Sequence, residues 1–245
     1  MNWAKSKTIL IIALLITNIF LLINYTSANY KKPETTQLER SVVEFLRENN
    51  VFIYAAIPSD TYNLPVLEVE VEKFDKEVVD RIIAEYDQAF PQEVSREALL
   101  LYAETFMIEN DLIEKSAVLD KLTSLNNNYV LEYRNKDISS DIYIEESYLV
   151  CTISKNRITN IEKRWIKAKE YGQTKKNTIS ATKALLKFMS EDETNRAISV
   201  TNIEMVYWVD SSFVNTENTT LDTAFPAWKI TYNNEKEKYI LAYEE

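Results

Sequence analysis

A run of sixteen uncharged residues, Thr8 to Ile23, constrains the fold of this chain more than any other sequence feature. Lys5 and Lys7 precede the run, and a polar stretch follows it. At 1.5 Å per residue the run forms a helix of about 24 Å, and the flanking aromatics Trp3 and Tyr25 extend it enough to span a slightly thinned bilayer. The sequence therefore predicts a transmembrane anchor over residues 8–25.

The positive charges nearest the anchor predict its direction. Lys5 and Lys7 lie on its N-terminal side, and positive flanks stay in the cytoplasm. We expect a single-pass protein of the cell membrane, with residues 1–7 cytoplasmic, residues 26–35 forming a stalk, and the C-terminal domain outside. A cleaved secretory signal is the alternative, since Thr26, Ser27 and Ala28 are small or polar. The apolar run is long for a signal, which favours the retained anchor.

The amide of Asn18 falls near the middle of the run. An amide in hydrocarbon seeks a hydrogen-bond partner, and a bond to a neighbouring helix contributes about 0.6–2 kcal/mol. The other reading is a bond to the backbone of its own helix, and both readings stay open.

The rest of the chain is acidic. The protein has a net charge of −10, and its first 33 residues hold four lysines and no acid, so the remainder carries −14. Nucleic-acid affinity comes largely from basic side chains on phosphates, so we expect no DNA or RNA partner.

Three residue types are nearly missing, which excludes much catalytic chemistry. There is no histidine, so histidine-based triads and zinc motifs are excluded. Gly172 is the only glycine, which excludes the glycine-rich phosphate loops and the nucleophile elbow. Cys151 is the only cysteine and cannot form an intrachain disulfide. We therefore expect no catalytic residues, no cofactor and no metal.

Hydrophobic periodicity predicts an α+β fold with antiparallel sheets and packed helices. We expect Asn-rich turns in place of glycine turns. Residues 97–109 fit a helix or a hairpin, and we favour the hairpin. The expected helices are 36–48, 75–86, 116–125 and 179–190. The expected strands are 51–57, 64–71, 129–134, 148–153, 158–166, 198–209, 228–232 and 238–243.

The order of these elements predicts two subdomains, residues 36–126 and 127–245. The order helix, strand, strand occurs over residues 36–71 and returns with an extra strand over 179–243. A duplicated unit would make the subdomains similar, although the match is one of topology and not of residue identity.

Two short stretches, one near each end of the chain, carry recognisable motifs. At the N-terminus Asn2 and Trp3 precede a basic pair and the segment Asn18-Ile19-Phe20-Leu21-Leu22. At the C-terminus the motif consists of Pro226, Ala227, Trp228, Lys229 and Ile230, followed by Tyr239, Ala242 and Tyr243. Both stretches resemble the YycI (WalI) family of membrane-anchored bacterial regulators. The chain ends on Glu244-Glu245, without the glycine-containing tail that many relatives have.

The resemblance implies a function and partners. Relatives lie outside the membrane with a YycH-type companion and regulate the WalK (YycG) sensor histidine kinase, which governs cell-wall metabolism. It implies partner contact in the membrane through Asn18, Phe20, Leu21 and Leu22. It also implies a structural motif of Trp3, Pro226, Ala227, Trp228 and Tyr243. Activation and inhibition of the kinase both stay open.

Several charged or reactive groups admit a functional and a plainer reading. The basic residues Lys163, Arg164, Lys167, Lys169, Lys175 and Lys176 are read as a solvated strand edge and loop before a site for anionic polymer or lipid. The acidic runs Glu145-Glu146, Glu191-Asp192-Glu193 and Glu244-Glu245 are read as solvated turns or the chain end. Cys151, Trp208 and Trp228 are read as core residues.

The leading hypothesis is therefore a non-catalytic regulator of a sensor kinase. The alternatives are an anchored wall-modifying hydrolase that uses carboxylates alone, and a module that binds a small ligand or wall fragment. A hydrolase needs a cleft with two carboxyl groups roughly 5 to 9.5 Å apart, and a binding module needs a pocket with convergent polar groups.

Overall fold

The computed structural model of the chain describes residues 14, 17, 37–86, 95–125, 128–191, 196–209 and 221–243. Two compact units divide the chain, Met1–Glu44 and Phe45–Glu245, and the fold below is that of the second. The predicted anchor and stalk lie outside the described residues except for Leu14 and Thr17, which are helical. Trp3, Asn18, Phe20, Leu21 and Leu22 also lie outside them. Among the described residues, no helix is both long and apolar enough to cross a membrane.

The described helices begin at side-chain caps where these are resolved. They are α2 (Gln37–Glu48), α3 (Lys76–Glu85), α4 (Arg96–Glu109) and α5 (Ala181–Ser190). Asp75 accepts hydrogen bonds from the backbone N–H groups of Glu77 and Val78 at the start of α3. Ser180 accepts one from Lys183 at the start of α5. The predicted helices at 36–48, 75–86 and 179–190 are confirmed within a residue or two.

The hairpin expected at residues 97–109 is wrong, because this segment is the helix α4. Ser95 caps the helix by accepting a hydrogen bond from the N–H of Ala98. Leu99, Ala103, Phe106 and Met107 are buried, a spacing of four, seven and eight residues that forms one helical face. Leu101, which made the segment look like an alternating strand, is 66% exposed.

The helix expected at residues 116–125 is also wrong, because the segment is the strand β4 (Ala117–Leu125). β4 pairs antiparallel with β5 (Asn128–Asp137) from Ala117↔Asn135 to Leu125↔Asn128. This long ladder satisfies the backbone of a segment whose composition suits a helix, so tertiary pairing overrides local propensity.

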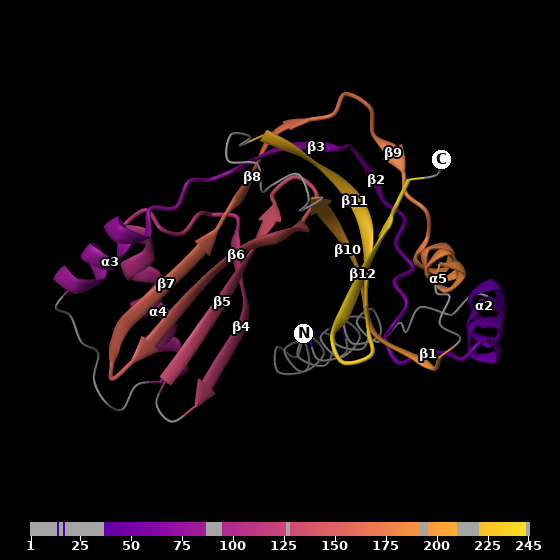
Figure 1. Cartoon of the computed structure of the whole chain (residues 1–245), viewed down its shortest axis with the longest axis horizontal. Helices are drawn as coiled ribbons and strands as arrows, with labels where there is room; N and C mark the ends of the chain where they lie inside the picture. Colours follow the sequence, from indigo (N-terminus) through magenta and orange to yellow (C-terminus); the bar gives the residue numbers. More distant parts are fainter. Residues whose placement is uncertain are drawn as a thin grey trace, which may run out of the picture. The chain divides into compact units, whose positions relative to one another are not determined.

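Within the described ranges, ten strands form one mixed sheet, whose main path runs β4-β5-β6-β10-β11-β3-β8, and two short strands pair separately (Figure 1). The α+β class is confirmed, but the sheet is not purely antiparallel, because β10 pairs parallel with β1 and with β6. The remaining strands are β1 (Val51–Ile53), β2 (Asn63–Leu64), β3 (Leu67–Val71), β6 (Ile142–Ser154), β7 (Arg157–Arg164), β8 (Ile166–Tyr171), β9 (Lys176–Asn177), β10 (Ile198–Val209), β11 (Leu221–Tyr232) and β12 (Lys236–Leu241).

Most strand predictions are right in place and differ in length. The strand expected at 198–209 is confirmed as β10, and the one expected at 158–166 breaks at Trp165 into β7 and β8. Asn156, Asn233 and Asn234 take positive φ at the hairpin turns, as expected for asparagine where glycine is absent. The predicted subdomain boundary at residue 126 stays a prediction.

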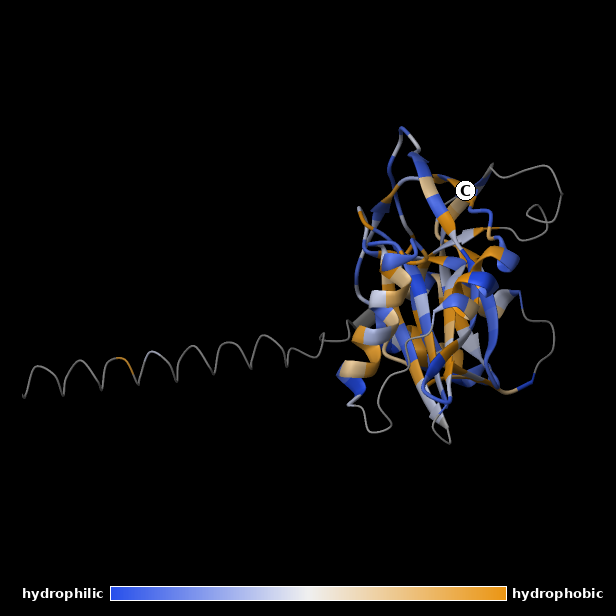
Figure 2. Cartoon of the chain, turned by 90° about the vertical axis from the view of Figure 1, so that its left-hand side faces the viewer, coloured by the Kyte–Doolittle hydropathy of each residue, from blue (hydrophilic) through white to orange (hydrophobic). Residues whose placement is uncertain are grey.

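The described helices pack on the sheet through buried apolar side chains. α3 and α4 bury Val79 and Phe106 against Leu131, Leu149 and neighbours of β5, β6 and β7. α5 packs Phe188 against Tyr232 of β11, with ring centroids 5.0 Å apart. Figure 2 shows hydrophobic residues along these strands and helices and hydrophilic ones towards the outer loops.

Candidate functional site

The C-terminal motif residues lie together at a junction between α5 and the end of the chain. Trp228 is fully buried, and its indole N–H donates a hydrogen bond of 2.9 Å to the carbonyl of Ile179, just before α5. Tyr243 donates to the carbonyl of Leu64 at 2.9 Å. The carbonyl of Pro226 accepts a hydrogen bond from the N–H of Ala242. These contacts fasten α5 and the last strand to the sheet, so they hold the fold and present no reactive group.

A buried ion network is the most distinctive polar feature of the described residues, and it lies on the face of β11 opposite to Trp228. Its centre is Glu145 of β6, whose side chain is almost fully buried. Glu145 accepts hydrogen bonds from Lys229 of β11 at 3.0 Å, from Tyr239 of β12 at 3.0 Å, and from Arg134 of β5. A buried carboxylate is stable only when opposite charges and donors compensate it, and this one has both.

Further carboxylates surround the two cations. Arg134 lies 3.7 Å from Glu204 of β10 and 4.0 Å from Asp120 of β4. Lys229 also pairs with Glu237 of β12 at 2.7 Å. The network therefore links six strands of the sheet, across the short parallel pairing of β6 with β10.

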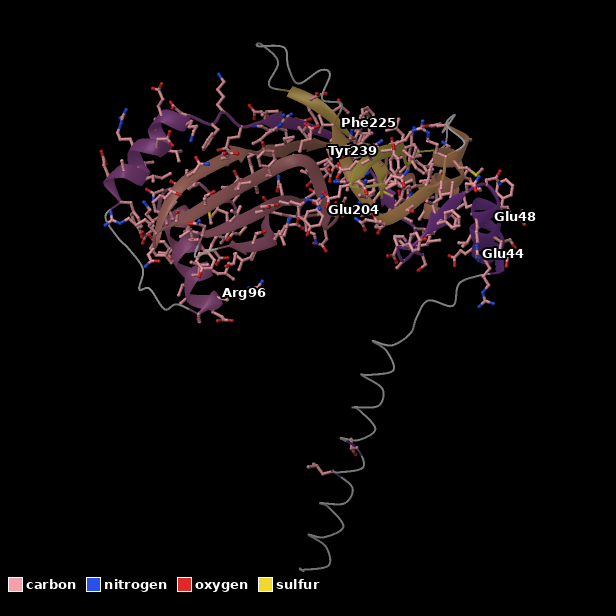
Figure 3. The ribbon with its side chains drawn as sticks, turned by 60° about the horizontal axis from the view of Figure 1, so that its bottom comes forward. Glu44, Glu48, Arg96, Glu204, Phe225 and Tyr239 are labelled. Carbon is pink, nitrogen blue, oxygen red and sulfur yellow. The ribbon has the colours of Figure 1, made fainter. Side chains whose placement is uncertain are left out.

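Aromatic rings border the network. The guanidinium of Arg134 lies 4.1 Å from the ring centroid of Tyr143. Trp208 stacks on Tyr239 with centroids 5.9 Å apart and an interplanar angle of 21°. Figure 3 labels Glu204, Phe225 and Tyr239 in this region. Half-buried Trp, Tyr and Arg side chains are the types that anchor protein interfaces.

The pKa values in the network follow from burial and charge. Burial raises the pKa of Glu204, and the neighbouring Arg134 only partly offsets this. For Glu237, hydrogen bonds from Lys229 and Tyr239 outweigh burial and lower the pKa. Burial disfavours the charge on Lys229, yet its bonds to Glu237 and Glu145 raise its pKa. The cations thus stay charged at neutral pH.

The geometry favours a structural or contact role over catalysis. Glu145 and Glu237 both accept from Lys229 and from Tyr239. Each of these carboxylates is already held by a cation, which leaves little freedom for proton transfer. Among the described residues, no group of His, Cys, Asp and Glu is arranged to hold a metal ion.

Glu145 is the residue that sequence reasoning missed. The expectation that Glu145-Glu146 lies at a solvated turn is wrong, because both residues lie inside β6. Glu146 takes a positive φ of 58°, which forms a bulge in β6. In the sequence, a strand here is indicated by the alternation of Ile142, Tyr143 and Ile144, which Glu145 continues.

The basic cluster is largely neutralised by acids. Lys163 pairs with Glu72, Arg164 with Glu146, and Lys169 with Glu70. Lys167 pairs with Glu72 and Glu114. Arg164, Lys167 and Lys169 are partly exposed, as expected for a solvated strand edge, whereas the side chain of Lys163 is buried, contrary to that expectation. These pairs give little support to an anion site.

The single cysteine is a core residue, as expected. Cys151 is fully buried within the cluster formed by α3, α4 and the strands beneath them. Burial raises the pKa of its thiol to about 12, which suppresses the reactive thiolate. Trp228 is also core, whereas Trp208 is half-buried.

Comparison with known proteins supplies one strong match. A family model described as YycI protein matches residues 30–243. Among solved structures, the C-terminal domain of Bacillus megaterium YpeB is similar with a TM-score of 0.35 and 13% sequence identity, over 64% of this chain and 64% of that one. The chain thus spans less than two thirds of the length of that structure. No curated protein sequence matches significantly.

Proposed function

Because the chain belongs to the YycI family, we propose that it is a non-catalytic, extracytoplasmic regulator of a sensor histidine kinase of the WalK (YycG) type. It acts with a YycH-type companion, is anchored by residues 8–25, and controls cell-wall metabolism through the kinase. The observation that carries this proposal is the family match over residues 30–243.

The sheet face that carries the ion network supports a role in contacts with a protein partner. It combines Trp208, Tyr143 and Arg134 with a network that holds them in place. Interface energy concentrates in such pre-ordered aromatic and Arg side chains. We propose this face as the outer contact surface and the Asn18–Leu22 segment as the contact surface in the membrane.

Carboxylate-based hydrolysis has weaker support. Glu145 and Glu237 share the donors Lys229 and Tyr239 and so lie close together. A hydrolase needs one carboxyl kept protonated and the other free to act on substrate. The pKa of Glu237 is lowered and Glu145 is enclosed by three donors, so neither suits the acid role.

The anchor is tested by exchange. Residues 8–23 are replaced by an unrelated apolar span of equal length, and kinase output is read from a promoter that the kinase controls. We expect altered output at unchanged surface level of the protein. Asn18→Leu should reproduce part of the change, whereas Thr8→Leu at the edge of the span should not. Unchanged output in the exchange variant would exclude the membrane contact.

The outer surface is tested separately. Trp208→Ala should weaken crosslinking between the purified chain and its YycH-type companion, with Leu101→Ala on the opposite, helix-covered side as the matched control. Equal crosslinking of both variants would exclude this face.

Thiol labelling tests on which side of the membrane each part of the chain lies. The native Cys151 is buried and so should give no background signal. Ser59→Cys, at an exposed position, should react with a membrane-impermeant maleimide in intact cells. Ser6→Cys should react only after permeabilisation. The reverse pattern would overturn the proposed orientation.

A further inference from the structure

Acidic side chains outnumber cations in the ion network around Glu145. Its cations are Arg134 and Lys229, and both side chains are mostly buried. They pair with four carboxylates, those of Asp120, Glu145, Glu204 and Glu237. Two of these negative charges are therefore not balanced by a cation of the network.

The unbalanced charge lies where a partner can reach it. The side chains of Asp120 and Glu237 are 40% and 41% exposed, and that of Glu204 is 25% exposed, whereas that of Lys229 is only 11% exposed. Burial raises the pKa of Glu204, and the charge of Arg134 offsets this only in part. A further cation beside Glu204 would stabilise its charged form.

Aromatic and apolar side chains lie beside these acids on the same face. In the register of the sheet Glu204 is opposite Lys229, and Lys229 is opposite Tyr239, so the three form one row across β10, β11 and β12. Neighbouring strands are about 4.8 Å apart, which puts the backbone of Tyr239 about 10 Å from that of Glu204. Trp208 stacks on Tyr239, and Leu241 of β12 is 47% exposed. Figure 3 shows Glu204 and Tyr239 in the same part of the sheet.

Accessible carboxylates next to half-buried rings fit an arginine side chain. A guanidinium group is flat, forms two parallel hydrogen bonds to a carboxylate and stacks on aromatic rings. A lysine ammonium group lacks the flat shape that both contacts use. A second copy of this chain is disfavoured as the partner, because the residues after position 33 carry a net charge of −14 and would repel one another.

We propose that this face binds an arginine side chain of the YycH-type companion, with the guanidinium paired to Glu204 and lying beside the rings of Trp208 and Tyr239. The companion and the contact face come from the proposed function, on which this inference rests. The arginine and the role of Glu204 go beyond it.

Affinity measurements test the role of Glu204. The purified full chain and the purified companion are mixed in detergent micelles, and biolayer interferometry measures the Kd at neutral pH. Glu204→Gln removes the charge and keeps the shape, so it should raise the Kd about tenfold. Glu85→Gln removes an exposed carboxylate from α3, which packs on the other face, and should leave the Kd unchanged. Because burial raises the pKa of Glu204, the fold should tolerate the loss of its charge, and thermal melting checks this.

Chemical protection tests the identity of the partner's side chain. Phenylglyoxal modifies arginine, and mass spectrometry measures the reaction at each arginine of the companion. One arginine should be protected in the complex with the parent chain and should react freely in an equally occupied complex with the Glu204→Gln variant. Acetylation of the companion's lysines should leave the Kd unchanged. Loss of binding on acetylation, with no arginine protected, would assign the contact to lysine and overturn the proposal.

An unchanged Kd for Glu204→Gln would also overturn the proposal. If Trp208→Ala still weakens binding in that case, the face remains the outer contact surface and only the recognition of arginine is wrong. If neither variant weakens binding, the face itself is excluded as a contact surface. The exchange of the anchor tests kinase output without reference to either result, so the regulatory function is judged separately.

Discussion

The ammonium group of Lys229 on β11 donates a hydrogen bond of 3.0 Å to the carboxylate of Glu145 on β6, 84 positions away in the chain. Both side chains are nearly buried, and the bond joins strands on either side of β10. β6 and β10 themselves pair at only two positions, Val206↔Tyr143 and Tyr207↔Ile144. The ion network therefore reinforces the sheet where its backbone ladder is shortest.

Glu145→Gln should destabilise the protein by about 3 kcal/mol, the lower end of the range for a broken buried ion pair, because Glu237 still neutralises Lys229. Urea unfolding of the purified chain measures this. Glu68→Gln changes an exposed carboxylate on β3 and should shift the free energy of unfolding by no more than about 0.5 kcal/mol. Equal effects of the two variants would mean that the network does not stabilise the fold.

Trp228→Phe should cost about 2 kcal/mol of unfolding free energy. The substitution removes the N–H that satisfies the buried carbonyl of Ile179 and leaves a small cavity beside α5. Urea unfolding measures the loss, and Phe225→Leu on the same strand, which is half-buried, provides the comparison. An unchanged free energy of unfolding in the Trp228→Phe variant would show that this hydrogen bond is dispensable.

The acid side of the stability profile should depend on Glu237. Its pKa is lowered in the folded state, so its contribution is present above the unfolded value of about 4.3 and is lost as the pH falls through the folded value. Glu237→Gln should therefore be less stable than the parent at pH 7 and equal to it at strongly acid pH. The side chain is partly exposed, so the difference should stay below about 1 kcal/mol. A difference that does not change with pH would contradict this.

The contribution of Glu204 to stability should change with pH in the opposite direction to that of Glu237. Its folded pKa is raised, so the folded state binds a proton more tightly than the unfolded state, and its stabilising contribution is lost as the pH rises through the folded value. Glu204→Gln should gain stability relative to the parent as the pH increases from about 4 to 7. Paired melting curves across this range measure the change, and a relative loss over the same range would refute it.

Cys151 should be inert in the folded protein. The thiol is fully buried and its pKa is raised to about 12, so a thiol reagent at pH 8 finds neither access nor thiolate. Ellman's reagent should react only after denaturation. Ser59→Cys supplies an accessible thiol in the same chain as a positive control. Reaction of the native parent at the rate of that control would disprove the burial of Cys151.

Local patterns were enough where an element is amphipathic and capped. Asp75 and Ser180 cap the starts of α3 and α5. The strand predicted from Ile198 to Val209 has the same bounds as β10. Patterns misled at α4, where residues 99, 101 and 103 alternate like a strand. They also misled at β4, whose composition suits a helix. In both places the outcome depends on which neighbour buries the segment.

The candidate site was less accessible to sequence reasoning. The sequence predicted that Glu145 belongs to a solvated pair, because no neighbouring residue in the sequence identifies Arg134, Lys229 and Tyr239 as its partners. The row of Glu204, Lys229 and Tyr239 was equally hidden, since it depends on the register of three strands.

The sequence by itself determined the apolar N-terminal run, the acidic character of the chain after residue 33, the exclusion of histidine and glycine-loop chemistry, and the family motifs, because these depend on residue type and local spacing. Only the tertiary structure decided the mixed sheet, the identities of α4 and β4, the ion network around Glu145 and the row of Glu204, Lys229 and Tyr239. The physical reason is range: long-range strand pairing and charge compensation join residues many positions apart. No local window of the chain contains both partners.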